Sequence, residues 1–460
     1  MAIVSYKLLS LLPLLLASLA VLSRAMITPN GKTKTTSSLF DVQASIRKTL
    51  DVFSPGSREV EDSLKDDDHR SHSSSSSSER SYSFTLRPRL SVRPTRARDY
   101  KSLMAARLAR DSARMKSLRA RLDPAVETDA DQDAPVTFSS NSGVGEYFVS
   151  LGIGDPPQQI NMIMDTGSDV CWVSKTVFDP SKLPTYHELA CNAPLCQSCN
   201  NNNKCTFNLK YGDGSTASGV LAPEKVTFSG GSSVDGIVIG SADVAWGMWA
   251  GAGALVGLSR GAVSLSSQMN ASSFSYCLVD QDSKSKSTLD FNSDAPAGSV
   301  FAPLLSNPPT PNFYYVGLAG ISVGGGGVIS ALPGSGGQAI VDSGTAMTRF
   351  PRDLYTAVEN EFIRLMGNTS RWSVPPFNTC FDLKDNKSAN VTTLSFHFSN
   401  DNVLTLPPEN ILVPVDSSGT FCFAFAVAAS TTIIGNLQQQ GMRVSFDLDN
   451  NDIGFAPGQC

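Results

Sequence analysis

The sequence predicts an all-β protein made of two similar lobes, and repeated segments support this fold class. Residues 164–169 read MDTGSD and residues 341–346 read VDSGTA, so the second aspartate follows the first by 342 − 165 = 177 residues. An apolar run before each aspartate is typical of a buried strand that ends in a tight, glycine-containing turn. A second repeated segment, two apolar residues followed by glycine, ends at Gly257 and at Gly435. Gly257 lies 257 − 165 = 92 residues after the first aspartate, and Gly435 lies 435 − 342 = 93 residues after the second. The two halves of the chain are therefore laid out alike.

The composition agrees with short strands joined by turns. Among the 460 residues there are 36 glycines and 26 prolines, 41% of the residues are hydrophobic and 17% are charged. A chain of this length can bury two sizeable cores, and its many Val, Ile, Thr and Phe residues favour strands.

Paired copies of one motif indicate two lobes related by a pseudo-twofold axis, with Asp165 and Asp342 meeting at that axis. Two carboxylates about 3 Å apart do not both ionise easily, so one remains an acid while the other acts as a base toward a shared water. Such a pair can attack an amide carbonyl without a metal, a cofactor or a covalent intermediate.

At these motifs the sequence resembles the pepsin-like aspartic proteases, and among them the plant group that includes nepenthesin and the guard-cell aspartic protease. The resemblance runs from about residue 146 to residue 460 and includes residues 273–280 (SFSYCLVD), 313–318 (FYYVGL) and 420–426 (TFCFAFA). It implies the bilobal pepsin-like fold and an aspartic endopeptidase that holds a polypeptide substrate in the cleft between its lobes. Asp165 and Asp342 would be the catalytic residues.

The resemblance also implies roles for the neighbours of the aspartates. Tyr211 would be the flap tyrosine, on a hairpin whose Asp-Gly pair favours a tight turn that closes over substrate. Trp172 would hydrogen-bond this tyrosine, although simple core filling is its alternative role. The expected flap residues are Tyr211, Gly212, Asp213 and Gly214, and the expected supports of the aspartates are Thr166, Gly167, Ser168, Ser343, Gly344, Thr345 and Trp172.

The first 25 residues have the pattern of a secretory signal peptide. Lys7 precedes an apolar run over residues 8–22, and a Ser-Arg-Ala sequence follows it. The run is shorter than the roughly 20 residues that a membrane span needs, so we expect cleavage, with an uncleaved anchor as the alternative. The mature protein is expected to be a monomer without a membrane span, either extracellular or kept in the endoplasmic reticulum or vacuole.

Residues 26–133 are expected to form a propeptide that is largely disordered, because this segment is polar and includes six serines at 73–78. Within it, residues 99–122 have apolar side chains at helical spacing among many arginines, which predicts a basic amphipathic helix. The apolar positions are Tyr100, Leu103, Met104, Leu108, Met115, Leu118 and Leu122.

Charge favours a partner for this segment within the same chain. Residues 1–133 carry 22 Lys and Arg against 16 Asp and Glu, a net charge of +6, whereas the rest carries 15 against 26, a net charge of −11. We expect the basic segment to bind the acidic body at neutral pH and to loosen as carboxylates become protonated. A solvated helix without a partner is the alternative, and the signal peptide argues against a nucleic-acid-binding arm.

The folded part is expected to consist of an N-terminal catalytic lobe over residues 134–310 and a C-terminal catalytic lobe over residues 311–460. Residues 147–153 and 159–164 are predicted to be paired strands around a turn at 154–157. Residues 351–366 have apolar side chains at helical spacing and should form a helix that packs against a lobe.

In a secreted chain, nine cysteines indicate disulfides rather than zinc ligands. By resemblance, Cys277 should pair with Cys460 and Cys380 with Cys422. Five cysteines remain between residues 171 and 205, and Cys171 is the expected unpaired one because it lies in a buried strand position. In this region the chain departs from its relatives, which have a longer cysteine-rich insert, so the pairing there stays open. Glycosylation is expected at the sequons of Asn270, Asn368, Asn386 and Asn390.

Two other functions need consideration. Residues 257–261 (GLSRG) fit the G-x-S-x-G pattern of serine hydrolases, with Asp342 and His397 in the matching order. That pattern requires alternating strands and helices, which this region lacks. No H-E-x-x-H or comparable metal-binding spacing is present. The other alternative is a catalytically silent binding protein on the same scaffold, as in the plant xylanase inhibitors; the two retained aspartates argue against it without deciding.

Overall fold

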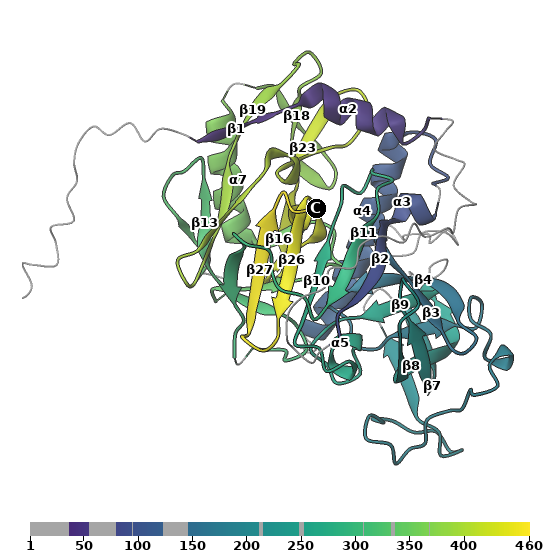
Figure 1. The fold of residues 1–460 in the computed structure, drawn as a ribbon. Helices are drawn as coiled ribbons and strands as arrows, with labels where there is room; N and C mark the ends of the chain where they lie inside the picture. Colours follow the sequence, from purple (N-terminus) through teal and green to yellow (C-terminus); the bar gives the residue numbers. More distant parts are fainter. Residues whose placement is uncertain are drawn as a thin grey trace, which may run out of the picture. The chain divides into compact units, whose positions relative to one another are not determined.

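The two repeated motifs lie at equivalent places in two sheets of a computed structural model. The structure describes residues 36–54, 80–93, 95–122, 146–210, 215–247, 253–306, 308–332, 336–367 and 369–460. Residues 36–460 belong to one compact unit, which Figure 1 shows as strands with few helices. No helix in the described ranges is long and apolar enough to cross a membrane.

The larger of the two sheets is built mainly from the first half of the chain. In spatial order it contains β12 (Val300–Pro303), β27 (Asp452–Pro457), β26 (Met442–Asp447), β10 (Ser273–Cys277), β11 (Ser287–Phe291), β2 (Tyr82–Pro88), β3 (Tyr147–Ile153), β4 (Gln158–Asp165), β9 (Ala254–Gly257), β5 (Trp172–Ser174), β8 (Ser233–Trp246), β7 (Thr216–Thr227) and β6 (Thr206–Lys210). The expected hairpin of β3 and β4 is confirmed, and Gly154 in its turn has a φ of 87°.

The second half forms the other sheet that carries a motif. Its order is β21 (Val403–Leu406), β20 (Leu394–Phe398), β13 (Tyr315–Val323), β15 (Gln338–Val341), β25 (Thr432–Ile434), β16 (Thr348–Pro351) and β24 (Phe425–Ala428), with β14 (Ile329–Ser330) beside β13. A smaller sheet contains β17 (Arg371–Val374), β18 (Phe377–Asp382), β23 (Thr420–Phe423) and β22 (Leu412–Pro414), and β1 (Ser37–Phe40) pairs with β19 (Ala389–Thr392).

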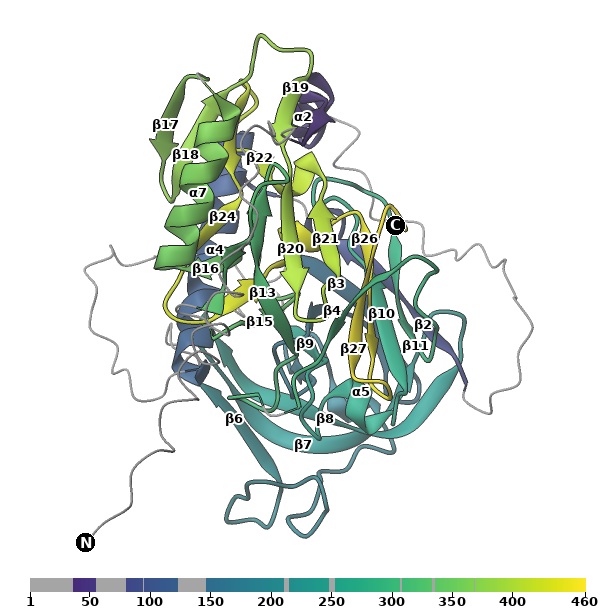
Figure 2. The ribbon, with the colours of Figure 1, turned by 90° about the vertical axis from the view of Figure 1, so that its left-hand side faces the viewer.

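The helices lie on the outside of these sheets or between them. They are α2 (Val42–Asp51), α3 (Arg89–Val92), α4 (Tyr100–Leu122), α5 (Leu265–Gln268) and α7 (Arg352–Met366), with short 3-10 turns η2 (Pro180–Lys182), η4 (Pro408–Asn410) and η5 (Asn436–Gln439). The predicted helix at 351–366 is confirmed as α7, which buries Leu354, Tyr355, Val358 and Phe362. Figure 2 shows α7 running beside the strands of the second half.

The strands do not divide at residue 310 as the sequence suggested. β26 and β27 come from the C-terminal end, yet β26 pairs with β10 of the first half, and β27 pairs with both β26 and β12. The main hydrophobic cluster likewise contains residues from both halves. A boundary read along the sequence misses this exchange, because strand pairing joins segments that lie more than 150 residues apart.

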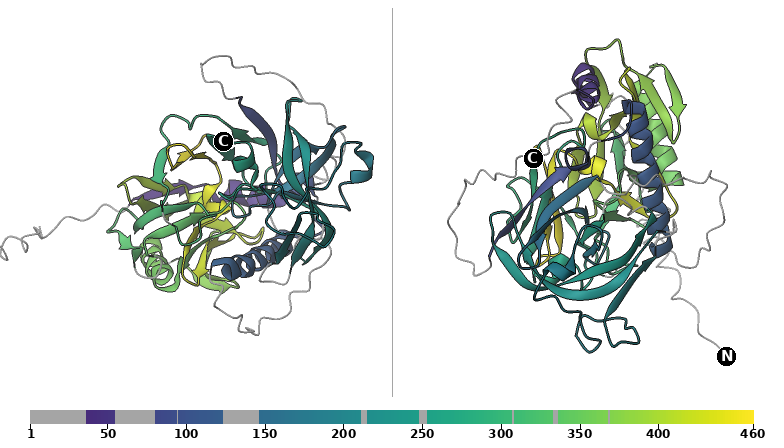
Figure 3. Two further views of the ribbon diagram at one scale, coloured as in Figure 1. Left: turned by 90° about the horizontal axis from the view of Figure 1, so that it is seen from below. Right: turned by 90° about the vertical axis from the view of Figure 1, so that its right-hand side faces the viewer.

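The segment before the first motif is more ordered than its composition suggested. Besides the predicted helix, now seen as α4, the structure has β1 and α2 at residues 37–51 and β2 and α3 at residues 82–92. The expectation of a largely disordered segment is wrong for these residues. They cannot form a core among themselves, but they bury apolar side chains such as Phe40 and Phe84 on the body. The left view of Figure 3 shows α4 (blue) between the teal strands and the green and yellow strands.

Candidate active site

Parallel strand pairing explains the matched spacing of the two motifs. β4 lies parallel to β9, which aligns Asp165 with Gly257, and β15 lies parallel to β25, which aligns Val341 with Ile434. The residues that follow in the second pair are Asp342 and Gly435. Each aspartate therefore lies at the end of a buried strand, next to an apolar strand about ninety residues further along the chain. This arrangement agrees with the spacings of 92 and 93 residues.

Glycine is required at the C-terminal end of β9 and directly after β25, the two partner strands. A Cβ on Gly257 would lie 2.3 Å from the backbone oxygen of Asp169, and a Cβ on Gly435 would lie 2.6 Å from the backbone carbon of Met347. Both contacts are too close for any side chain, because the neighbouring atoms belong to the main chain. In both halves, the loop after the aspartate therefore lies directly against the strand that pairs with the aspartate's own strand.

Thr166 and Ser343 connect the two aspartate loops by reciprocal hydrogen bonds. The Ser343 backbone N–H donates to Thr166 Oγ1 at 3.0 Å, and the Thr166 backbone N–H donates to Ser343 Oγ at 3.1 Å. Each hydroxyl in turn donates to the opposite strand, at Val341 O and Met164 O. All these atoms are buried, so the exchange fixes one loop against the other without competition from water.

The two carboxylates have matching donors. Gly167 N and Gly344 N donate to the Oδ1 atoms of Asp165 and Asp342 at 2.9 and 3.0 Å. The hydroxyls of Ser168 and Thr345 donate to the Oδ2 atoms. Both aspartates are almost fully buried, with exposures of 2% and 0%. The symmetrical donors fix the orientation of each carboxylate and stabilise its charged form.

The side chain of Arg114, in the middle of α4, lies between the two carboxylates. Its Nη1 and Nη2 atoms each donate to Asp165 at 2.8 Å, and Nη2 also lies 3.1 Å from both carboxylate oxygens of Asp342. The guanidinium is 2% exposed. One nitrogen of a cation therefore contacts both aspartates.

The pair has unequal proton affinities. Burial and the nearby Asp342 carboxylate raise the pKa of Asp165, although the Arg114 charge opposes them. Burial would also raise the pKa of Asp342, but Arg114 and the hydrogen bonds from Thr345 and Gly344 outweigh it and lower this pKa. The two groups titrate as a pair in which one carboxyl holds its proton more tightly than the other.

Other ion pairs hold α4 on the first half of the chain. Arg110 Nη2 lies 2.6 Å from Glu146 Oε1, and Arg107 Nη2 lies 2.8 Å from Asp282 Oδ1. Tyr100 donates to Asp282 as well, at 2.6 Å. All of these groups are buried, so the carboxylates and guanidinium groups depend on one another for charge compensation.

Further contacts hold the same helix on the second half. Asp111 accepts a hydrogen bond from Ala346 N at 2.8 Å and pairs with Arg349. Leu118 is fully buried with Phe313 and neighbouring apolar residues. α4 therefore contacts both halves of the chain and covers both aspartates.

A cavity of about 360 Å³ remains beside the aspartates, under the end of α4. Its lining includes Asp169, Asn208, Asn312 and Arg121. Arg121 donates to Gly167 O, and its guanidinium carbon lies 4.6 Å from the centre of the Phe313 ring. The helix supplies part of the cavity wall through Arg121.

The predicted flap residues Tyr211, Gly212, Asp213 and Gly214 lie outside the described residues, as does the sequon of Asn368. Trp172 is fully buried in β5, among residues of the first half. The other three sequon residues, Asn270, Asn386 and Asn390, are exposed. Asn390 lies in β19, directly opposite Leu39 of β1.

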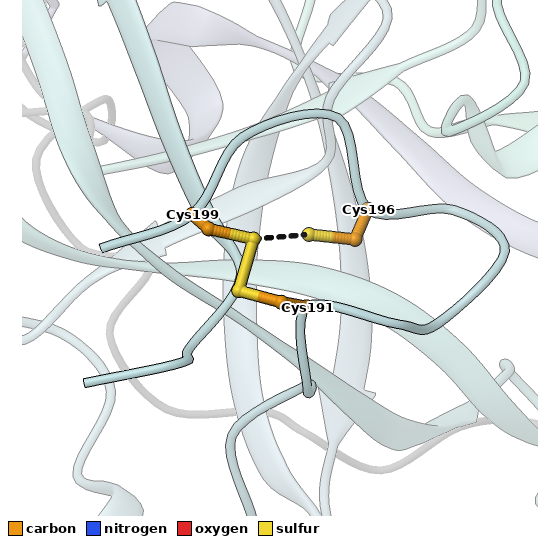
Figure 4. A group of neighbouring side chains, drawn as sticks. All are labelled: Cys191, Cys196 and Cys199. Atoms are coloured by element: carbon orange, nitrogen blue, oxygen red, sulfur yellow. Dashed lines mark hydrogen bonds between the residues drawn. A yellow bond between two sulfur atoms is a disulfide. The ribbon is translucent and has the colours of Figure 1, made fainter. Parts of the chain in front are cut away.

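The cysteines form four disulfides. They join Cys277 to Cys460, Cys380 to Cys422, Cys191 to Cys199 and Cys196 to Cys205, and they leave Cys171 buried as a free thiol. In Figure 4 the Cys196 sulfur lies beside the bonded pair, 3.7 Å from the Cys199 sulfur. These three sulfurs could geometrically surround a metal ion, but their disulfides remove the thiolates that would bind one.

The alternative serine-hydrolase triad is not assembled. Ser259 is buried and its hydroxyl donates to Asp169. His397 Nε2 lies 2.7 Å from Ser322 Oγ, on a strand of the other half, and Asp342 faces Arg114. The G-x-S-x-G pattern at residues 257–261 is therefore a structural turn that supports the loop after Asp165.

Sequence reasoning did not single out Arg114. It treated the arginines of this helix as the polar face, whereas Arg107, Arg110 and Arg114 are all buried against the body. Their spacing of three and four residues places them on one face of a helix, and this periodicity was the available signal. Periodicity alone does not reveal which of many arginines faces a carboxylate.

Comparisons with known proteins identify the family of the chain. Residues 147–292 match the family described as xylanase inhibitor N-terminal, and residues 313–457 match its C-terminal counterpart. A protein of Arabidopsis thaliana named aspartic protease in guard cell 2 is 37% identical over 397 residues, covering 79% of this chain and 84% of that protein. Aspartic proteinase nepenthesin-2 of Nepenthes gracilis is 35% identical, covering 78% of this chain and 86% of that protein.

Solved structures share the fold at lower identity. The crystal structure of edgp superposes with a TM-score of 0.58 at 20% identity and covers 68% of this chain and 91% of that one. Basic 7S globulin from soybean gives a TM-score of 0.56, also at 20% identity, and covers 67% and 91%. The bilobal all-β fold expected from the sequence is thus confirmed. Together with the curated relatives, these matches show that the chain belongs to the pepsin-like aspartic protease family.

Proposed function

We propose that this chain is the precursor of an aspartic endopeptidase of the secretory pathway, kept inactive by its own N-terminal segment. The observation that carries this proposal is the position of Arg114 between two buried, symmetrically supported aspartates. Residues 1–25 would be the signal peptide and residues 26–133 the propeptide, with α4 as its inhibitory part. Four disulfides support a route through an oxidising compartment.

Peptide hydrolysis would proceed once α4 has left. A water held between Asp165 and Asp342 gives a proton to the ionised carboxylate and attacks the carbonyl carbon of the scissile peptide bond. The protonated carboxyl gives its proton to the carbonyl oxygen, which leaves a tetrahedral intermediate. The intermediate then collapses, the C–N bond breaks, and a proton returns to the leaving nitrogen. Two carboxylates that share one site hold one proton between them, which suits this division of roles once Arg114 has left.

Cleavage of a peptide by the purified proprotein, shifted to about pH 4, tests the proposal, because coupled dyads of this kind work in acid. We expect cleavage that pepstatin inhibits and that Asp165→Asn and Asp342→Asn abolish. Asp243→Asn is the matched control, since Asp243 is half exposed and pairs only with Lys175 among the described residues. Pepstatin-resistant cleavage that survives the Asp165 change would contradict the mechanism.

A catalytically silent binding protein is the second candidate. It is favoured by the descriptions of the two matching families, which name xylanase inhibitors. If the proprotein cleaves no peptide at any pH after α4 has been removed, the binding function is the better conclusion.

A further inference from the structure

Residues 36–54 bind a part of the body that is separate from the candidate active site. β1 adds to the edge of β19 in four antiparallel residue pairs, from Ser37 opposite Thr392 to Phe40 opposite Ala389. α2 follows directly, and the Asp41 side chain accepts a hydrogen bond from Ala44 N at its start. Figure 1 shows β1 beside β19, and Figure 2 shows α2 beside β19.

Apolar burial anchors this segment. Phe40 is 1% exposed and Val42 is fully buried, and both belong to the main hydrophobic cluster of the protein. The Phe40 ring packs edge-on against Phe421 of β23, with the ring centres 5.2 Å apart. Without this segment, Phe421 and the edge of β19 would lose their cover, so the segment completes the core rather than merely lying on it.

Hydrogen bonds fix the segment along its whole length. Thr36 N donates to Gly324 O at 2.9 Å, Gln43 Nε2 donates to Lys384 O and Asn386 O, and Thr49 Oγ1 donates to Ser417 Oγ at 2.9 Å. None of these partners belongs to the loops that carry the aspartates. The hydrogen bonds of residues 36–54 are therefore separate from the contacts that α4 makes with the aspartates, although Val52 and Phe53 pack against the apolar cluster that contains Tyr100 and Leu103 of α4.

The two N-terminal segments differ in how much they depend on ion pairs. α4 buries apolar side chains such as Leu118 but also forms several buried ion pairs, whereas α2 has one ion pair, between Lys48 and Asp280, with side chains 56% and 37% exposed. Glu409 and Asp282 are the other charged groups that act on Lys48. Protonation of carboxylates would thus weaken the contacts of α4 much more than those of residues 36–54.

We propose that residues 36–54 stay bound as a separate chain after the precursor is cut, so that the mature protein consists of two polypeptides. This proposal rests on the proposed maturation, in which peptide bonds are hydrolysed with the uptake of water. Residues 55–79 connect the two segments and include six consecutive serines, so one cut there would separate them. No cysteine precedes Cys171, so the retained chain would be held by non-covalent contacts alone.

The test uses the full chain in an Asp165→Asn background, so that it does not depend on activity. Recognition sites for a sequence-specific protease are inserted within residues 55–79 and within residues 123–145. After both cuts and a shift to about pH 4, chosen to protonate carboxylates whose ordinary pKa values lie near 4, the body is recovered by gel filtration and its fragments are weighed by mass spectrometry. We expect the fragment with residues 36–54 to remain with the body. The other fragment contains β2 as well as α4, and β2 pairs with both β3 and β11, so its release is not part of this test.

Two variants test whether the burial of Phe40 holds the fragment on the body. Phe40→Asp should lose the fragment, whereas Leu39→Asp should keep it, because Leu39 is 70% exposed on the same strand. Loss of the fragment from the otherwise unaltered chain would overturn the proposal, even if Phe40→Asp failed to fold. Retention of the fragment in Phe40→Asp would also overturn the proposal, because binding of the fragment would then not depend on the burial of this side chain. Peptidase activity is not read in this test, so a failure of the proposed function would not be confused with a failure here.

Discussion

The guanidinium of Arg114 forms a two-point contact with the carboxylate of Asp165, with both N–O distances at 2.8 Å. The same guanidinium contacts Asp342, so α4 supplies the one cation that two buried carboxylates share within the described chain. Removing one partner from such a buried arrangement leaves uncompensated charge, which typically costs about 3–5 kcal/mol. Contacts at Arg114 therefore contribute to the binding of α4, and under the proposed function they would also keep the precursor inactive.

Arg114→Met should weaken the hold of α4 on the body. We expect the precursor to become active at a pH closer to neutral than the unaltered protein does, because two carboxylates would then face each other without a cation. The measurement is the pH at which half of the precursor becomes active in a fixed time. Arg119→Met is the matched control, because Arg119 lies exposed on the same helix. Equal activation pH for the two variants would contradict a special role for Arg114.

Glu146 should act as an acid-sensitive contact for α4. Burial alone would raise its pKa, but Arg110, Arg107 and Arg89 outweigh burial and lower it from the ordinary value of 4.5. A carboxyl with a lowered pKa stabilises the bound state above its ordinary pKa, and this contribution disappears as the pH falls through the lowered value. Release of α4 should therefore begin below pH 4.5.

Glu146→Gln checks this contribution, since it removes the charge at every pH while keeping the size of the side chain. We expect activation to shift to higher pH, measured in the same assay as for Arg114. Glu188→Gln is the control, because the Glu188 side chain is 35% exposed and its ion pair with Lys204 is long, at 3.7 Å. An unchanged activation pH for Glu146→Gln would show that the arginines around it hold α4 without this carboxylate.

Local patterns were sufficient to predict that the two aspartates lie at equivalent places, because each motif is followed at a matching distance by the segment that pairs with it, ending at Gly257 and at Gly435. They were also sufficient for β3, β4 and α7, whose periodicity reflects burial of one face. They could not predict that β2 enters the large sheet between β11 and β3. Nor could they place Phe40 against Phe421, since that burial depends on a surface built from residues hundreds of positions away.

Thr345 should set the acidic limit of activity. Its hydroxyl donates to Asp342 at 2.6 Å and helps to lower the pKa of that carboxyl. In Thr345→Ala the pKa of Asp342 should rise, so the ionised form that acts as a base would appear only at higher pH. We expect the acidic limb of the kcat/KM profile to move upward and the maximum to fall about tenfold, as loss of a hydrogen bond to a charged group suggests.

Thr345→Ser should restore both features, because it keeps the hydroxyl and loses only a methyl group. A profile for Thr345→Ala that matches the unaltered enzyme in position and height would contradict this role. A fall in kcat/KM that Thr345→Ser shares would instead assign the effect to packing of the methyl group.

The reactivity of the Cys171 thiol should show whether the sheet that carries Asp165 stays closed in solution. Burial raises the pKa of its thiol to about 12, and its Sγ donates to Gly257 O at 3.6 Å, beside the partner strand of Asp165. A thiolate is the reactive form, so the folded protein should not react with a thiol reagent near neutral pH. In denaturant without a reductant, one thiol per chain should react, because disulfides hold the other eight cysteines.

Cys171→Ala should leave no reactive thiol in denaturant, which assigns the signal to this position. Three reactive thiols per chain in the unaltered protein would mean that one of the four disulfides does not form. Reaction of the folded protein would mean that β5 and β9 separate in solution often enough to expose Cys171. Because β9 also carries Gly257, such opening would release the loop that positions Asp165, and the rate of thiol reaction would then follow the loss of peptidase activity.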